Sequence, residues 1–290
     1  MDFIQATRHI FPLLKLFAIS PFDISGSPGQ RHIHKNRKCL IFGGIFLTFA
    51  SCFMLRQLVV YSQMVFQLMD VVILITTLIF IVTFIRVGIS TFLNHHKYIQ
   101  IYQELIDISD LHSICYKYFT IIYYFFIFKI SYFLLNTLFE ISLYLNEFFI
   151  VNIYNELIFS SLELYHFAFI SQLNLILISL ICIFKALNEN LSNFKIHSNL
   201  FYKLFNLLDQ LNLMEGINLL FLTFYIFFWI LASFFSLAWA VLHSKDEKLT
   251  IEIYFIVDVC IIIFRHMIVL CVLIEKLKNE VRYLFVFPFI

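Results

Sequence analysis

Six long apolar runs dominate the chain. Most of the Lys and Arg residues lie in every second segment that connects or flanks these runs, so they would fall on one side of a membrane. The runs are Cys39–Ser62, Met64–Ile85, Tyr118–Leu145, Leu157–Phe184, Ile217–Leu242 and Ile253–Ile274. Each reaches the length of about 20 apolar residues that a helix needs to cross a bilayer. No water inside a bilayer can satisfy exposed backbone groups, and no segment shows a strand's period of two over a barrel-like array. The predicted fold class is therefore all-α, a polytopic membrane protein with six transmembrane helices.

Composition excludes a soluble protein. The chain is 61% hydrophobic and 13% charged, whereas ordinary globular domains are about half apolar and about a quarter charged. The formal net charge is +1, and the basic residues are spread over loops rather than gathered in one patch, so nucleic-acid binding is not expected.

The basic residues also predict the orientation, because cytoplasmic loops are enriched in Lys and Arg. With the N-terminus placed inside, fifteen of the 20 Lys and Arg residues lie on the cytoplasmic side. Only Arg56, Lys245 and Lys248 lie in outer flanks, and Lys129 and Arg265 lie within spans. Both termini are therefore expected to face the cytoplasm, which argues against a receptor of the rhodopsin type.

Three segments are expected: a cytoplasmic N-terminal segment (1–38), a transmembrane domain (39–275) and a cytoplasmic tail (276–290). Helical spacing of apolar residues predicts cytosolic helical extensions at about 86–117 and 185–216. The pattern is clear in Lys185–Gly216 and weaker in Ser90–Ile108. The apolar stretch from Phe11 to Ile19 contains Lys15, so it reads as an amphipathic lead-in rather than a signal peptide.

Polar and ionisable groups at membrane depth are costly, and this makes them candidates for function. Together with tyrosines of the outward half, they could line a crevice for a small organic ligand. The candidate ligand-binding residues are Asp70, Asn136, Glu140, Tyr144, Glu163, Tyr165, His166, Tyr254 and Asp258. Structural hydrogen bonds between helices explain the same residues equally well. No catalytic motif, metal-ligand spacing or cofactor motif is present, so neither an enzyme nor a bound cofactor is expected.

Four stretches carry a resemblance to a known family. They are the proline-bounded Pro12–Phe22, the segment Leu187–Leu191 after the fourth run, Leu204–Phe221 with Asn218 before an aromatic-rich run, and Cys271 followed by Ile274–Lys276. Together with the inside N-terminus, this pattern resembles the insect gustatory receptor family of the insect chemoreceptor superfamily. The odorant receptors are a near neighbour.

The resemblance implies a ligand-gated, non-selective cation channel in the plasma membrane of sensory neurons. It implies a homo- or hetero-tetramer that takes a small organic tastant in the outward half of each subunit and forms its pore from a seventh helix. The sequence departs from the family after Arg282, where residues 283–290 hold neither a seventh span nor the family's Thr-Tyr and Gln-Phe signature. We therefore expect a receptor truncated before the pore helix, or one that acts without its own pore.

Two other classes stay open at this point. In a small-molecule transporter, Asp70, Glu163, His166 and Asp258 would be the coupling or substrate groups. In an accessory subunit, the cytosolic helices would assemble with a full-length chemoreceptor.

Overall fold

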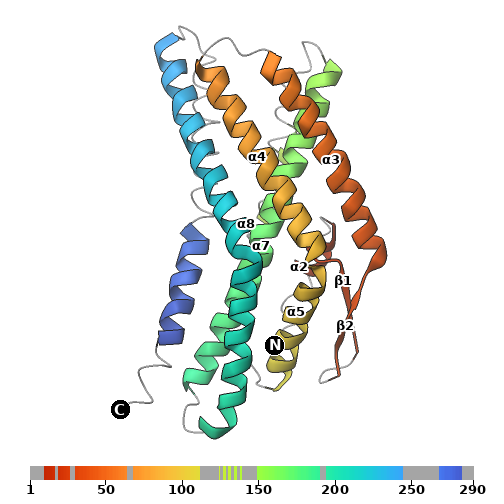
Figure 1. Ribbon diagram of the computed structural model, residues 1–290, viewed down its shortest axis with the longest axis vertical. Helices are drawn as coiled ribbons and strands as arrows, with labels where there is room; N and C mark the ends of the chain where they lie inside the picture. The colour runs from red at the N-terminus through yellow and green to blue at the C-terminus, as the bar shows by residue number, and fades with distance from the viewer. Residues whose placement is uncertain are drawn as a thin grey trace. The chain divides into compact units, whose positions relative to one another are not determined.

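The computed structural model describes residues 10–16, 19–26, 30–63, 68–111, 149–189, 194–243 and 268–282, with isolated residues between 124 and 138 (Figure 1). The chain divides into two compact units. Unit 1 contains Met1–Phe46, Thr91–Leu207 and Leu273–Ile290, and unit 2 contains Leu47–Ser90 and Leu208–Val272. The predicted boundaries near residues 38 and 275 stay predictions, because compactness does not report where a bilayer begins.

The described residues are almost entirely helical. The helices are α2 (Ile10–Leu16), α3 (Arg37–Gln63), α4 (Leu68–Leu93), α5 (His95–Leu111), α7 (Phe149–Glu189), α8 (Phe194–His243) and a final helix over 268–282. Two short strands, β1 (Phe22–Ser25) and β2 (His32–Lys35), precede α3. The predicted helical class is confirmed for the long apolar segments that the structure describes.

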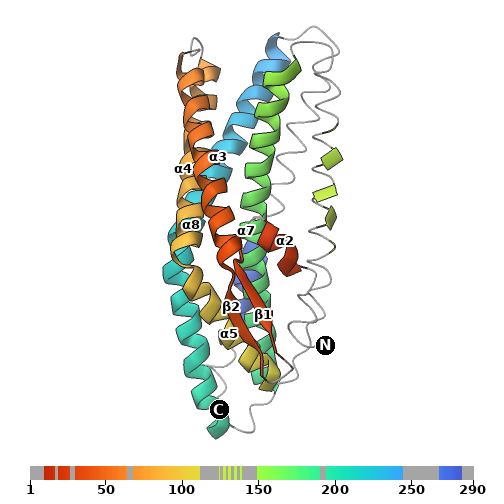
Figure 2. The same ribbon diagram turned by 90° about the vertical axis from the view of Figure 1, so that its right-hand side faces the viewer.

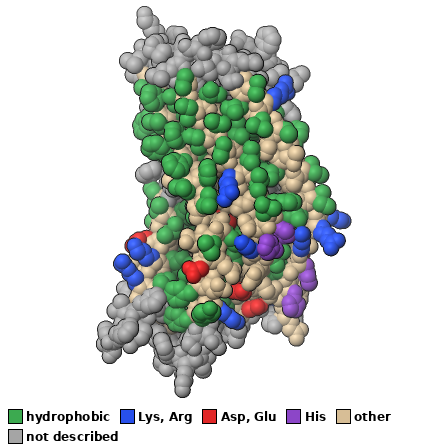
Figure 3. Space-filling view, in the orientation of Figure 1, with side chains coloured by type: hydrophobic (Ala, Val, Ile, Leu, Met, Phe, Trp, Pro, Cys, Tyr) green, Lys and Arg blue, Asp and Glu red, His purple; other side chains and the backbone are tan. Residues whose placement is uncertain are grey.

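Four of the described helices are long and apolar enough to cross a membrane. Their candidate spans are Arg37–Val59, Leu74–Leu93, Leu164–Glu189 and Leu200–Phe235. They correspond to the first, second, fourth and fifth predicted runs. The runs Tyr118–Leu145 and Ile253–Ile274 fall largely outside the described residues, so the number of six spans and the orientation stay predictions. Figure 3 shows hydrophobic side chains covering much of the visible face, as lipid-facing helices require.

The helices α7 and α8 are longer than a bilayer needs. They contain 41 and 50 residues, or about 60 and 75 Å at 1.5 Å per residue, while the hydrocarbon core is about 30 Å thick. Both must continue into water or into other protein. The predicted boundary between a cytosolic extension ending at Gly216 and a span beginning at Ile217 does not interrupt α8, which runs through it without a break.

The predicted amphipathic segment Ser90–Ile108 is not one helix. Asn94 forms a turn that ends α4, and its carbonyl oxygen accepts hydrogen bonds from the backbone amides of Lys97 and Tyr98 at 2.9 and 3.1 Å. Asn tolerates such a position because its short side chain competes with the helical backbone. The apolar periodicity survives the turn, so the pattern alone could not reveal it.

Three hydroxyl groups within the candidate spans are satisfied by their own helix. The side chains of Thr76, Thr83 and Ser179 donate to the carbonyl oxygens four residues earlier, at 2.8, 2.8 and 2.7 Å. This back-bonding removes most of the cost of placing a hydroxyl where no water is available. Within unit 2, Thr83 also approaches the carbonyl oxygen of Phe221 on α8 at 3.4 Å.

The N-terminal segment departs from helix, because β1 and β2 pair antiparallel from Phe22↔Lys35 to Ser25↔His32. Figures 1 and 2 show this hairpin beside α5. Gln103 of α5 fixes it there. Its Oε1 accepts from the Ile33 amide at 2.9 Å, and its Nε2 donates to the Arg31 carbonyl oxygen at 2.8 Å.

A buried aromatic group lies under the hairpin in unit 1. The rings of Phe11, Phe22 and Tyr102 pack against one another with centroid separations of 5.0–5.4 Å. They come from α2, β1 and α5, so they join two neighbouring N-terminal elements to a helix much later in the chain. Burial raises the pKa of the Tyr102 hydroxyl above its ordinary value, and Gln172 and Ser20, which interact with the hydroxyl, offset part of that rise.

The turn of the hairpin predicts one sensitive position. Gly26 has φ of 102°, and the backbone carbonyl of Gln30 occupies the place that a Cβ atom would take. Gly26→Ala is expected to destabilise the hairpin by about 1–3 kcal/mol, seen as faster amide hydrogen exchange in β1 and β2. Gly216→Ala is the control, because a Cβ there meets only ordinary contacts within α8, and it should leave hairpin exchange unchanged. Equal exchange in both variants would contradict the strain argument.

Candidate functional site

The structure describes few of the predicted ligand-binding residues completely. Only Tyr165 and His166 have described side chains. Asp70 lies in α4 and Glu163 in α7, but their side chains are outside the described part. The remaining predicted residues, Asn136, Glu140, Tyr144, Tyr254 and Asp258, lie outside the described residues altogether. The predicted pocket as a whole therefore stays a prediction.

Tyr165 and His166 lie deep in α7, with side chains 5% and 4% exposed. The Tyr165 ring lies 6.2 Å from the ring of Phe46 in unit 1. In the apolar stretch of the span that holds both residues, Leu164–Glu189, 89% of the residues are buried. The corresponding share for Arg37–Val59 is 17%. Tyr165 and His166 therefore face protein rather than lipid, which agrees with either a ligand pocket or structural hydrogen bonding.

A second polar group, in unit 2, consists of Ser90, Glu215 and Asn218, which we term the polar cluster. All three side chains are buried, at 7%, 1% and 0% exposed. The Asn218 amide nitrogen donates to Ser90 Oγ at 2.8 Å and to Glu215 Oε2 at 2.9 Å. The cluster joins α4 to α8 with a carboxyl group inside the candidate span Leu200–Phe235. A buried carboxyl group is costly unless it is hydrogen-bonded, so the cluster is a candidate for function.

The sequence interpretation missed Glu215 as a site residue, because it assigned this residue to a cytosolic extension. Asn218 was noted only for its family resemblance. One local signal pointed to both: Glu215 and Asn218 are three residues apart, which places them on one helical face. Their common partner, Ser90, is 128 residues from Asn218, and no local pattern could have supplied it.

An aromatic row lies along the same helices of unit 2. The ring centroids of Phe80 and Tyr225 are 5.0 Å apart, and those of Tyr225 and Trp229 are 6.1 Å apart. Among the described residues, the Trp229 Nε1 atom is buried and has no hydrogen-bond partner. A buried donor without an acceptor costs about 1–3 kcal/mol. The row therefore combines apolar aromatic faces with one unsatisfied donor.

The described residues contain no group of three His, Cys, Asp or Glu side chains close enough to hold a metal ion. Within this part of the chain, the chemistry on offer is hydrogen bonding and aromatic contact. Such groups can recognise a small organic molecule.

No protein-family model matches the sequence, and no curated protein is significantly similar to it. The function must therefore be argued from the residues and their geometry.

The polar cluster predicts a stability difference between two asparagines of α8. Asn218→Leu leaves the buried Glu215 and Ser90 without the amide, and it is expected to cost about 1–3 kcal/mol. Asn212→Leu is the control, because Asn212 is exposed on the same helix. Thermal unfolding in detergent, followed by helical circular dichroism, should show a lower midpoint for Asn218→Leu only. A double-mutant cycle with Ser90→Ala should give a coupling energy, and strict additivity would contradict the contact.

Proposed function

We propose that this chain is a chemoreceptor of the insect gustatory receptor type, which binds a small organic tastant such as a bitter plant compound. The proposal combines the resemblance of Pro12–Phe22, Leu187–Leu191 and Leu204–Phe221 to that family with a helical membrane-protein fold. Its expected location is the plasma membrane of sensory neurons.

The observation that carries the proposal is the Trp229 Nε1 donor at one end of the aromatic row, a buried atom without a hydrogen-bond partner among the described residues. A planar plant compound with a ring nitrogen or carbonyl oxygen would stack on Tyr225 and accept a hydrogen bond from Nε1. Such a ligand would supply the acceptor that no described residue provides. Helices α4 and α8 correspond to the second and fifth predicted spans, which belong to the region where the family resemblance expects ligand binding.

The long helices support the family's mode of action. Because α7 and α8 exceed the bilayer by about 30 Å or more, they offer protein surface outside the membrane for packing against other subunits. A homo- or hetero-tetramer is therefore proposed. In such a receptor, a tastant that binds the open state more tightly than the closed state opens a cation pore by shifting the population of states.

The aromatic row gives a direct test. Trp229→Phe keeps an aromatic ring but removes the N–H donor, so it is expected to weaken tastant binding about tenfold, the loss of one hydrogen bond. The chain has two tryptophans, and Trp239→Phe on the same helix is the matched control. Equilibrium binding of radiolabelled caffeine and quinine to the full chain in nanodiscs measures the effect. Unsaturable binding of both, or equal losses in the two variants, would count against the proposed site.

A transporter is a second candidate, and the buried Glu215 favours it because intramembrane carboxyl groups serve as coupling sites. Uptake of labelled caffeine into liposomes containing the chain separates the two functions. A transporter would accumulate the alkaloid at a rate that Glu215→Gln lowers at least tenfold. A receptor would bind the alkaloid without catalysing its flux, and Glu215→Gln would leave uptake at the level of empty liposomes.

A further inference from the structure

The hairpin and the start of α3 form an exposed basic surface. It consists of Arg31, His32, His34, Lys35, Arg37 and Lys38, which we term the basic hairpin surface. All of these side chains are exposed except that of Arg31, which is half-buried. Figure 3 shows Lys, Arg and His side chains gathered over the hairpin.

This surface has little opposing charge of its own. The sequence contains no Asp or Glu between Asp23 and Asp70. Both carboxylate oxygens of Asp23 are engaged, since Lys15 Nζ forms an ion pair with Oδ1 and Asn36 Nδ2 donates to Oδ2 at 2.8 Å. Among the described residues, Lys35, Arg37 and Lys38 take part in no ion pair. Glu104 and Asp107 on the adjacent α5 accept from Gln100 and Gln103.

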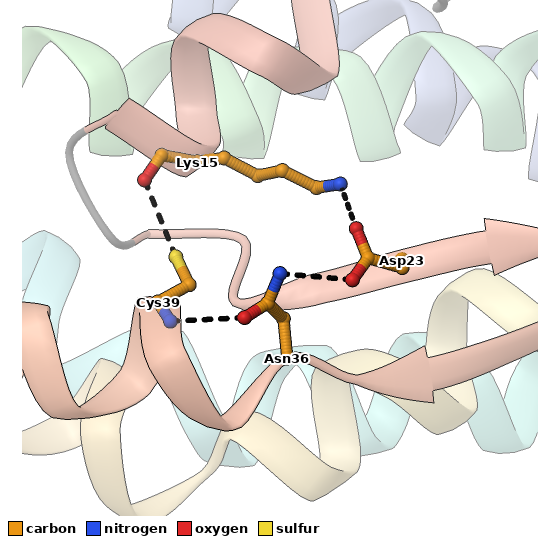
Figure 4. Close-up of polar contacts among 4 residues, drawn as sticks. All are labelled: Lys15, Asp23, Asn36 and Cys39. Atoms are coloured by element: carbon orange, nitrogen blue, oxygen red, sulfur yellow. Dashed lines mark hydrogen bonds and ion pairs between the residues drawn. The ribbon is translucent and has the colours of Figure 1, made fainter.

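The surface is held rigidly against the first candidate span. A single residue, Asn36, separates β2 from α3, and its Oδ1 accepts from the Cys39 amide at 3.0 Å as a helix N-cap. Figure 4 shows the network that continues from this cap, in which the Cys39 thiol donates to the Lys15 carbonyl oxygen at 3.3 Å and Lys15 reaches Asp23. The hairpin is thereby connected by hydrogen bonds to the first turn of α3, where the candidate span Arg37–Val59 begins.

This position lies at the level of lipid headgroups. The headgroup layer occupies roughly 5–8 Å on each side of the hydrocarbon core, and a four-residue strand is about 13 Å long. A hairpin one residue from a span therefore lies in or directly beside that layer. With the predicted orientation, this layer belongs to the cytoplasmic leaflet. Its anionic lipids raise the affinity of a basic segment for the membrane about fivefold for each Lys or Arg side chain.

We propose that the basic hairpin surface binds the headgroups of anionic lipids in the cytoplasmic leaflet. Lys35, Arg37 and Lys38 contact the phosphate and carboxylate groups of the lipid, and His32 and His34, on one face of β2, are additional hydrogen-bond donors. Gln103 holds the hairpin so that these side chains stay at one level. Because the headgroups bind at the start of α3, lipid composition changes the free energy of any movement of α3 relative to the leaflet.

Native mass spectrometry of the detergent-solubilised full chain tests the proposal with phosphatidylserine and phosphatidylcholine as probes. The wild-type chain should bind phosphatidylserine in preference to phosphatidylcholine. The triple variant Lys35→Gln, Arg37→Gln, Lys38→Gln should lose about 100-fold of that preference at low ionic strength. The matched control is Arg56→Gln, Lys185→Gln, Lys203→Gln, which removes the same charge from exposed positions dispersed over α3, α7 and α8 and should leave the preference within about twofold.

Two results would overturn the proposal: equal losses in both triple variants, or an unchanged preference in the hairpin variant. Glycerophosphoserine, which carries the headgroup without acyl chains, should not displace the lipid. Full displacement at equal concentration would indicate a site for soluble anions instead. If the triple variant fails to fold by circular dichroism, Lys35→Gln and Lys38→Gln serve singly, and each should lower the preference about fivefold, whereas no change in either would contradict the assignment.

Discussion

The absence of water within a bilayer is the constraint on which the rest of this structure depends. Every backbone amide and carbonyl at that depth needs a partner from the chain itself, and a helix provides one for each residue. The same constraint explains why Thr76, Thr83 and Ser179 return their hydroxyl groups to the preceding turn. It also explains why the Asn218 amide donates hydrogen bonds to two side chains instead of facing lipid.

Polar groups that find no partner in their own helix form hydrogen bonds between helices. In unit 2, Asn218 links α8 to Ser90 of α4, and the aromatic row beside it adds apolar contact between the same two helices. A contact of this kind is costly to break, because each separated partner is left unsatisfied. Two helices joined by few but specific polar contacts can therefore hold discrete arrangements, which is what a ligand-controlled protein requires. The proposed tastant contact at Trp229 lies one turn from Tyr225 on this same helix.

Strand pairing occurs where the constraint is relaxed, next to the start of the first span. There the backbone partners of β2 come from β1 and from the side chain of Gln103. The side chain of Asn36 then converts the strand into a helix by capping α3. The basic residues at this junction fit the proposed place in the headgroup layer, because that layer, unlike the hydrocarbon core, solvates charge. At this junction, the start of the first candidate span lies directly beside a surface that fits anionic lipids.

Local sequence determined the helical class and the candidate spans in α3, α4, α7 and α8, because hydropathy over about 20 residues decides whether a helix can enter a bilayer. The sequence did not reveal the turn at Asn94, since apolar spacing continues across it, nor the strands at Phe22 and His32, which are too short to show a period. The partners of the candidate site were decided by tertiary structure alone. Ser90 meets Asn218 across 128 residues, and rotation about a helix axis, which selects the facing side chains, depends on packing that hydropathy does not record.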